Sequence, residues 1–263
     1  MWCCLVGSEM CIRDSYMSNW RESMKKYILY LGALVSVASL AFADLANDSA
    51  SNYTGDTTFS TGANGGTGFG AWTLESFNGS SYVGGTAIGN PSFGLWSNAG
   101  GNSSATRALS SDLAIGETLS LDIGHTDNMG GEVGLSLKDG NSTVFNLKIS
   151  NTSGGQWKIW DGGADFNAGQ GWSANTPLSF SFTYNGVVDG QNSYDYSFGS
   201  ASGSDYRTAN AINSIDSIQI YNNGQDGGNL GFDNLSVIPE PATVGLFGIV
   251  GVIGTFIRRK FAI

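Results

Sequence analysis

The chain has few of the residues that usually carry catalysis or covalent cross-links. Its 263 residues include three cysteines, four prolines and one histidine, and only 13% are charged. Cys3, Cys4 and Cys11 all lie at the N-terminus, so disulfides cannot cross-link the rest of the chain and thiol catalysis is excluded there. A serine-type triad would have to use His125, which lies among aspartates and which we expect at the surface. The sequence also lacks a phosphate-binding loop and a Cys/His zinc set.

Paired carboxylates are the remaining route to catalysis, because most glycosidases use two of them. Away from the termini the only glutamates are Glu75, Glu117 and Glu132, which are far apart in sequence. We therefore predict a protein without enzymatic activity. The alternative is a secreted glycan-active hydrolase or lyase, whose activity would depend on Asp122, Asp127 or Glu132.

The central part of the chain is strongly acidic. Residues 44–238 contain five Lys/Arg against eighteen Asp/Glu, a net charge of −13. Such a charge repels phosphate backbones, so we expect no nucleic-acid partner. Aromatic residues make up 12% of the chain, enough to bury a core, and this argues against a disordered protein.

The first 23 residues show no periodicity that would indicate an element of structure. Their opening, MWCCLVGSEMCIRDS, resembles translated sequencing-adaptor read-through. We expect residues 1–23 to be an artefactual extension and Met24 to be the true start. The alternative is a genuine cytoplasmic extension.

Residues 24–43 have the three parts of a secretory signal peptide. Two lysines precede a 14-residue apolar stretch, Tyr27–Leu40, which is too short for a stable membrane span. Ala41 and Ala43 place small residues at the two positions that a signal peptidase recognises. We therefore predict a signal helix that is removed by cleavage before Asp44.

Residues 44–237 show strand periodicity and turn chemistry. Apolar and polar residues alternate in six segments, at 119–123, 133–137, 145–149, 178–184, 194–198 and 218–220. Asn-Gly and Asp-Gly pairs, which accept the positive φ of tight hairpins, occur at 138–141, 184–187, 188–191 and 222–224. No helical period is present. The pattern predicts an all-β domain, a two-sheet antiparallel sandwich.

The last strand of this domain contains a change of phase. Leu230 and Phe232 share one phase and Leu235 and Val237 the other, which predicts a bulge at Asp233-Asn234. The run Gly-Phe-Asp-Asn-Leu-Ser-Val resembles the last strand of jelly-roll sandwiches in carbohydrate-binding and lectin-like domains. The resemblance implies a jelly-roll-like arrangement.

The C-terminal segment, 238–263, combines three elements in a fixed order. Pro239, Glu240 and Pro241 are followed by 16 uncharged residues, which span roughly 24 Å as a helix, and then by a basic cluster. The members of that cluster are Arg258, Arg259 and Lys260. We predict a transmembrane helix whose basic end stays in the cytoplasm and leaves the domain outside.

This layout resembles the PEP-CTERM sorting signal. The resemblance implies processing by an exosortase near Pro-Glu-Pro, transient anchoring in the inner membrane, and delivery to the cell surface or an extracellular polysaccharide matrix. The alternative is a plain C-terminal anchor with a chance Pro-Glu-Pro.

Two kinds of ligand site are candidates in the domain. Trp160 and Trp172, with Asp161 and Asp165 between them, combine flat rings and carboxylates that suit sugars. The competing interpretation makes such tryptophans core residues, and strand alternation favours Trp160 as the exposed one. For calcium, the candidate ligands are Asp226 and Asp233, supported by Asp44, Asp48 and Asn229, and the alternative is a solvated acidic surface.

Together these features predict an exported, non-enzymatic surface or matrix protein associated with exopolysaccharide. Besides the hydrolase or lyase alternative, a structural spacer without a ligand is also compatible with the sequence.

Overall fold

The computed structural model describes residues 45–53, 59–126, 130–207, 214–224 and 228–239. All of them belong to one compact unit, residues 44–240. The predicted signal peptide, the transmembrane helix and basic cluster, and Glu240 and Pro241 lie outside the described residues.

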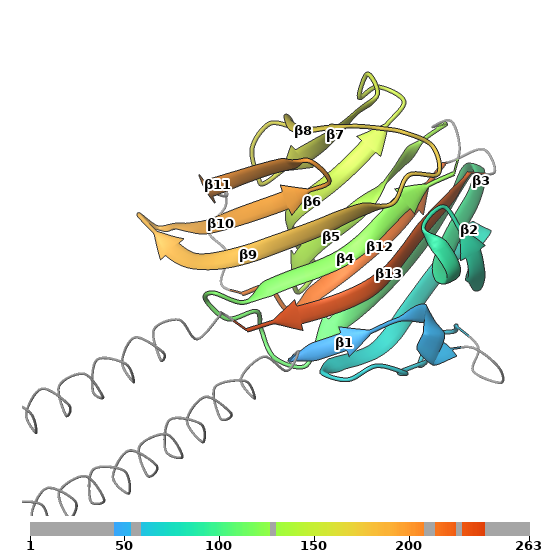
Figure 1. The fold of residues 1–263 in the computed structure, drawn as a ribbon, viewed down its shortest axis with the longest axis horizontal. Coiled ribbons are helices and arrows are strands. Elements are labelled where there is room, and N and C mark those ends of the chain that lie inside the picture. Colours follow the sequence, from blue (N-terminus) through green and yellow to red (C-terminus); the bar gives the residue numbers. More distant parts are fainter. Residues whose placement is uncertain (1–44, 54–58, 127–129, 208–213, 225–227, 240–263) are drawn as a thin grey trace, which may run out of the picture. The chain divides into compact units, whose positions relative to one another are not determined.

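Strands make up most of the described chain (Figure 1). A single 3-10 turn, η2 (Ala50–Tyr53), interrupts them within the described ranges. The strands are β1 (Ala46–Asp48), β2 (Phe69–Thr86), β3 (Gly89–Leu109), β4 (Thr118–His125), β5 (Glu132–Asp139), β6 (Ser142–Ser150), β7 (Gln156–Trp160), β8 (Phe166–Gly171), β9 (Leu178–Val188), β10 (Gln191–Phe198), β11 (Ala201–Arg207), β12 (Ser217–Asn223) and β13 (Asn229–Ile238).

The strands form two facing layers, which confirms the predicted antiparallel sandwich. Hydrogen bonding nevertheless runs through one continuous sheet, in the order β11-β10-β9-β4-β13-β3-β12-β5-β6-β7-β8, with β1 on β13 and β2 on β3. The long strand β3 belongs to both layers, because Phe93–Trp96 pair with β13 and Asn102–Ala108 pair with β12. Aromatic contacts join the layers, as between Trp157 and Phe198, whose ring centroids are 5.0 Å apart.

Glycines allow β2 and β3 to turn the corner between the layers. A Cβ on Gly79 would lie 2.5 Å from the carbonyl oxygen of Trp96, and one on Gly101 would lie 2.6 Å from that of Asn78. Backbone approaches this close exclude any side chain. The glycine-rich opening of the domain therefore forms its two longest strands.

Period-two alternation correctly located the inward residues of six other strands. All six alternating segments lie within strands, and Leu119, Leu121 and Ile123 of β4 are at most 2% exposed. Two of the hairpin turns predicted from Asn-Gly pairs are wrong. Strand β9 continues through Asn185-Gly186, where the positive φ of Gly186 accompanies a register shift against β10. Asn222–Gly224 makes no hairpin, because β12 pairs with β3 and β5 and has no pairing with β13.

The predicted bulge in β13 is confirmed. Its register against β4 shifts between Asp233 and Ser236, and Asn234 has a φ of 54°. Beyond the bulge, β13 pairs with β1, with Ala46 opposite Val237. The first and last strands of the unit are therefore neighbours (Figure 1).

Candidate functional site

A polar hollow of about 300 Å³ lies on the outer face of the layer formed by β2, β3, β12, β5 and β6. Its walls carry two carboxylates, four amides and three hydroxyls. The lining residues are Glu75, Asn102, Ser104, Glu132, Ser136, Asn146, Gln219, Tyr221 and Asn223. The inward residues of the same strands, such as Leu135 and Ile220, are fully buried. The alternation of side chains along each strand thus gives the layer an apolar inner face and a polar outer face.

Strand register aligns the outward residues in rows that cross the layer. One row contains Glu75, Ser104, Tyr221, Gly134, Lys148 and Lys158. The next contains Thr106, Gln219, Ser136, Asn146 and Trp160. A third contains Phe77, Asn102, Asn223, Glu132 and Ser150. The outer face of β2-β3-β12-β5-β6-β7 is called the polar face below.

Hydrogen bonds fix the centre of the polar face. The Tyr221 hydroxyl donates to Oε1 of Glu132 at 2.9 Å, and Nδ2 of Asn146 donates to the Tyr221 hydroxyl at 3.1 Å and to Ser136 Oγ at 2.7 Å. Burial of Tyr221 and the nearby Glu132 charge raise the pKa of this hydroxyl well above 10. The hydroxyl therefore stays protonated and remains a donor.

Charged groups of both signs meet beside the hollow. The Nζ of Lys148 lies 3.1 Å from Oδ2 of Asp165 and 3.8 Å from Oε2 of Glu132. Lys158 lies directly opposite Lys148 on the neighbouring strand. Asp165, a predicted ligand-binding residue, is therefore at this site and paired with a lysine.

Aromatic rings lie on both sides of the hollow. Trp160 is half-buried and pairs with Asn146. Phe77 is 70% exposed and pairs with Asn102. Trp157, in the other phase of β7, is 1% exposed, which confirms the expectation that Trp160 is the more accessible of the two.

Two predicted ligand-binding residues face the interior instead. Asp161 continues the inward phase of Trp157 and Ile159, is 8% exposed, and accepts a hydrogen bond from the Tyr194 hydroxyl at 2.9 Å. Trp172 packs partly buried against the core. The structure therefore places Trp160 and Asp165 at the polar face, whereas Asp161 and Trp172 pack toward the core.

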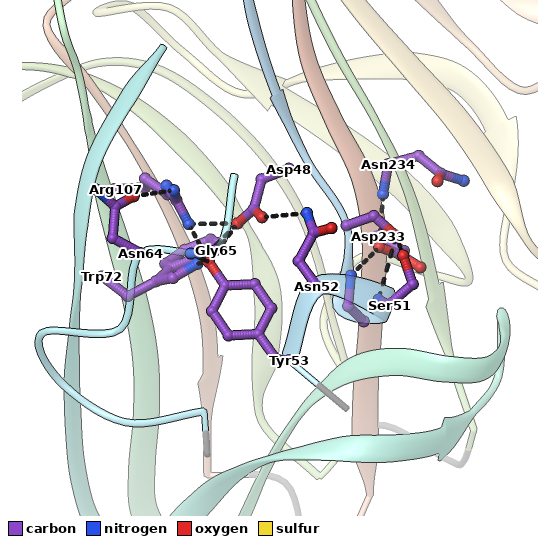
Figure 2. Close-up of polar contacts among 12 residues, drawn as sticks. Asp48, Ser51, Asn52, Tyr53, Asn64, Gly65, Trp72, Arg107, Asp233 and Asn234 are labelled. Atoms are coloured by element: carbon purple, nitrogen blue, oxygen red, sulfur yellow. Dashed lines mark hydrogen bonds and ion pairs between the residues drawn. The ribbon is translucent and has the colours of Figure 1, made fainter. Parts of the chain in front are cut away.

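The candidate calcium ligands have other roles (Figure 2). Oδ1 of Asp233 accepts hydrogen bonds from the backbone N–H groups of Ala50 and Asn234, both at 2.8 Å, and so ties η2 to the bulge in β13. Asp226 and Asp44 lie outside the described residues. Among the residues that the structure describes, no group of three or more His, Cys, Asp or Glu side chains is arranged to hold a metal ion.

Asp48 forms a buried ion pair with Arg107, and both are fully buried (Figure 2). The Tyr53 hydroxyl and the Trp72 indole N–H donate to the same carboxylate at 2.9 and 3.0 Å. The second guanidinium nitrogen of Arg107 donates to Asn64 at 2.7 Å. This network joins the first residues of the unit to β2 and β3. The role of Asp48 is therefore structural.

The catalytic candidates are dispersed. His125 is 1% exposed at the end of β4, in the inward phase of Ile123, so the expectation of a surface residue is wrong. Asp122 accepts hydrogen bonds from Ser179 and Asn234 on the other layer, away from the polar face. Asp127 lies outside the described residues.

Glu75 and Glu132, although far apart in sequence, line the same hollow. Their strands, β2 and β5, are separated by β3 and β12, which puts the two backbones about 14 Å apart.

Sequence reasoning missed most of the polar face. Alternation had located the strands of Tyr221, Asn146 and Lys148. It was therefore predictable that these side chains point away from the core. The order of the strands was not predictable, and it is this order that places β12 beside β5 and β2 in the same layer.

Comparison with known proteins identifies the C-terminal segment. Residues 237–260 match the PEP-CTERM protein-sorting motif. The chain carries a PEP-CTERM sorting signal. The match includes Pro239, which follows the last residue of β13, and it implies export and membrane-anchored transit. Within the described ranges, no helix has the length and apolar character needed to cross a membrane.

Among curated proteins, no sequence matches the chain. Solved structures resemble it weakly. A sialidase has 12% identity and a TM-score of 0.46, covering 62% of this chain and 17% of the sialidase. An endo-β-1,4-glucuronan lyase from the fungus Trichoderma reesei has 9% identity and a TM-score of 0.46, covering 75% and 96%. A structure from work on endo-acting O-glycanases of human gut microbiota has 10% identity and a TM-score of 0.48, covering 75% and 99%. Likenesses at this level carry no functional argument.

Proposed function

We propose that this chain is an exported surface or extracellular-matrix protein, sorted by an exosortase, whose β-sandwich binds exopolysaccharide without cleaving it. The observation that carries the proposal is the polar face, with its hollow and its two flanking aromatic rings, in a chain with a PEP-CTERM signal.

The chemistry of the polar face suits a sugar chain. Sugar hydroxyls both donate and accept hydrogen bonds, and the hollow presents carboxylates, amides and hydroxyls that do the same. The apolar faces of sugar rings stack on flat aromatic rings, which Trp160 and Phe77 supply at either side. An open face across several strands also accommodates a polymer that enters and leaves at both sides.

The partners and the positions of the two carboxylates of the hollow favour binding without cleavage. Oε1 of Glu132 already accepts a hydrogen bond from Tyr221, and its Oε2 lies 3.8 Å from the Nζ of Lys148, so both oxygens of this carboxylate have partners. Glu75, the other carboxylate of the hollow, is three strands away. This arrangement orders a binding surface better than it places an acid and a base on one glycosidic bond.

Retention of the purified unit, residues 44–240, on the host's own polysaccharide tests the proposal. This unit has its own core, and its first and last strands are paired. Wild-type protein should be retained, and Trp160→Ala should weaken retention several-fold through loss of stacking. Ile115→Ala is the matched control, because Ile115 is 67% exposed and does not line the hollow.

No retention of the wild-type unit would overturn the binding proposal. Release of new reducing ends or unsaturated products from the polymer would overturn the non-enzymatic part and favour the hydrolase or lyase alternative.

A further inference from the structure

We infer that the polymer bound at the polar face is an anionic polysaccharide, whose acidic groups pair with Lys148 and Lys158. The inference rests on the proposed function and narrows it from glycans in general to acidic ones. It depends on where this acidic domain places its few cations.

All three lysines of residues 44–238 occupy outward positions on one face. Lys138 is on β5, Lys148 on β6 and Lys158 on β7, each in the phase of the polar residues of its strand. Arg107, by contrast, is fully buried and paired with Asp48. In a domain with a net charge of −13, three of the five Lys/Arg residues thus lie on one face, and the remaining one, Arg207, is the last residue of β11 in the other layer.

Lys148 and Lys158 oppose each other directly across β6 and β7. Side chains opposite each other on neighbouring strands have Cβ atoms about 5 Å apart, and like charges in that position destabilise a sheet. Asp165 and Glu132 offset the charge of Lys148. Among the described residues, Lys158 is in no ion pair. An acidic group bound between the two ammonium groups would remove their repulsion.

The neighbouring ring completes a subsite. Trp160 lies two residues beyond Lys158 on the same face of β7, about 7 Å along the strand. A sugar ring stacked on Trp160 would therefore have its acidic substituent within reach of Lys158. The far side of the face ends at Glu75 and Phe77, where the carboxylate would reject an acidic group and the exposed ring would accept a sugar. The face thus has a cationic and an anionic side.

The experiment measures binding of residues 44–240 to two matched pairs of polymers. Polygalacturonate is compared with its methyl ester, and dextran sulfate with dextran, so that only the charge differs within a pair. We expect at least one charged polymer to bind about tenfold more tightly than its neutral partner and to lose affinity as salt is raised. The two pairs distinguish carboxylate from sulfate as the acidic group. Binding should be unchanged by EDTA, whereas a loss would indicate calcium bridging and overturn the lysine assignment.

Matched lysine variants locate the site. Lys158→Gln and Lys148→Gln should each reduce affinity for the charged polymer about fivefold. Lys138→Gln removes the same charge from the same layer, but Lys138 lies opposite Ser217 and Thr143 and away from the Lys148–Lys158 pair. This substitution should therefore leave affinity nearly unchanged. Asp165→Asn frees Lys148 from its nearest carboxylate and should increase affinity for the charged polymer.

The outcomes separate this inference from the proposed function. Equal binding of charged and neutral polymers, or equal losses in all three lysine variants, would overturn the inference and leave glycan binding intact. No binding to any of the four polymers or to the host's own polysaccharide would overturn both.

Discussion

Burial determines the role of each charged or phenolic side chain in this protein. Asp48 and Arg107 are both fully buried and form an ion pair. Asp165 forms a similar pair with Lys148 but remains 43% exposed. The two pairs should therefore differ greatly in their effect on stability. Removing one partner of a buried pair leaves the other charge uncompensated, whereas water screens an exposed pair.

Asp48→Asn should lower the free energy of unfolding of residues 44–240 by about 3–5 kcal/mol, because the Arg107 guanidinium would stay buried without its carboxylate. Asp165→Asn, the control, should change it by less than about 1 kcal/mol. Urea denaturation followed by tryptophan fluorescence measures both. Similar small effects of the two substitutions would contradict the buried network.

Burial also raises the pKa values of two tyrosines. Burial and the neighbouring Tyr206 raise the pKa of Tyr196 to about 12, and burial with the Asp161 charge raises that of Tyr194 further. An unfolded tyrosine ionises near pH 10, so above that pH the unfolded state loses protons that the folded state keeps. This contribution to stability is complete below pH 10 and is lost as the pH rises toward 12.

The urea midpoint should therefore fall between pH 10 and 12, and Tyr196→Phe should make the fall less steep. Phenolate absorbance of the folded protein should show part of its tyrosines titrating only with unfolding. A midpoint that is the same at pH 9 and pH 11.5 would contradict this assignment.

At the scale of elements, the corner strands β2 and β3 determine how the two layers meet. Both pass between layers, and at Gly79 and Gly101 the backbone of the partner strand leaves no room for a side chain. The position of the polar face depends on this corner, because β2 supplies Glu75 and Phe77 and β3 supplies Asn102.

Gly101→Ala should lower the free energy of unfolding by about 1–3 kcal/mol, since its Cβ would lie 2.6 Å from a carbonyl oxygen of β2. Gly85→Ala is the control within β2, because there the nearest atom would be 3.8 Å away, an ordinary contact. Its effect should stay within about 0.5 kcal/mol. Equal effects of the two substitutions would contradict the close approach at the corner.

These elements also indicate what the sequence can predict. Alternation located strands such as β4 and β6, and the change of phase located the bulge at Asp233-Asn234, because side-chain direction is a local property. Asn185-Gly186 looked like a turn but continues β9, since pairing with β10 stabilises the strand through a local irregularity. The polar face was not predicted, because Tyr221 and Glu132 meet only through the pairing of β12 with β5.

At the scale of the whole molecule, the two ends of the described unit are adjacent. Ala46 pairs with Val237, and Pro239 of the sorting motif follows the end of β13. The start of β1 and the end of β13 thus lie side by side. The sequence alone predicted both segments as sorting signals, and the motif match at residues 237–260 supports the C-terminal one. Cuts at Asp44 and within Pro-Glu-Pro would leave every described strand intact.

Intact-mass measurement of the protein from fractionated host cells, with and without the exosortase, tests this account most directly. The account predicts that the protein lies outside the inner membrane and begins at Asp44. In cells with the exosortase it should end near Pro239–Pro241, and in cells without the enzyme it should stay membrane-bound with the C-terminal segment attached. A full-length chain that is soluble in the cytosol, with residues 24–43 and 238–263 both present, would contradict it.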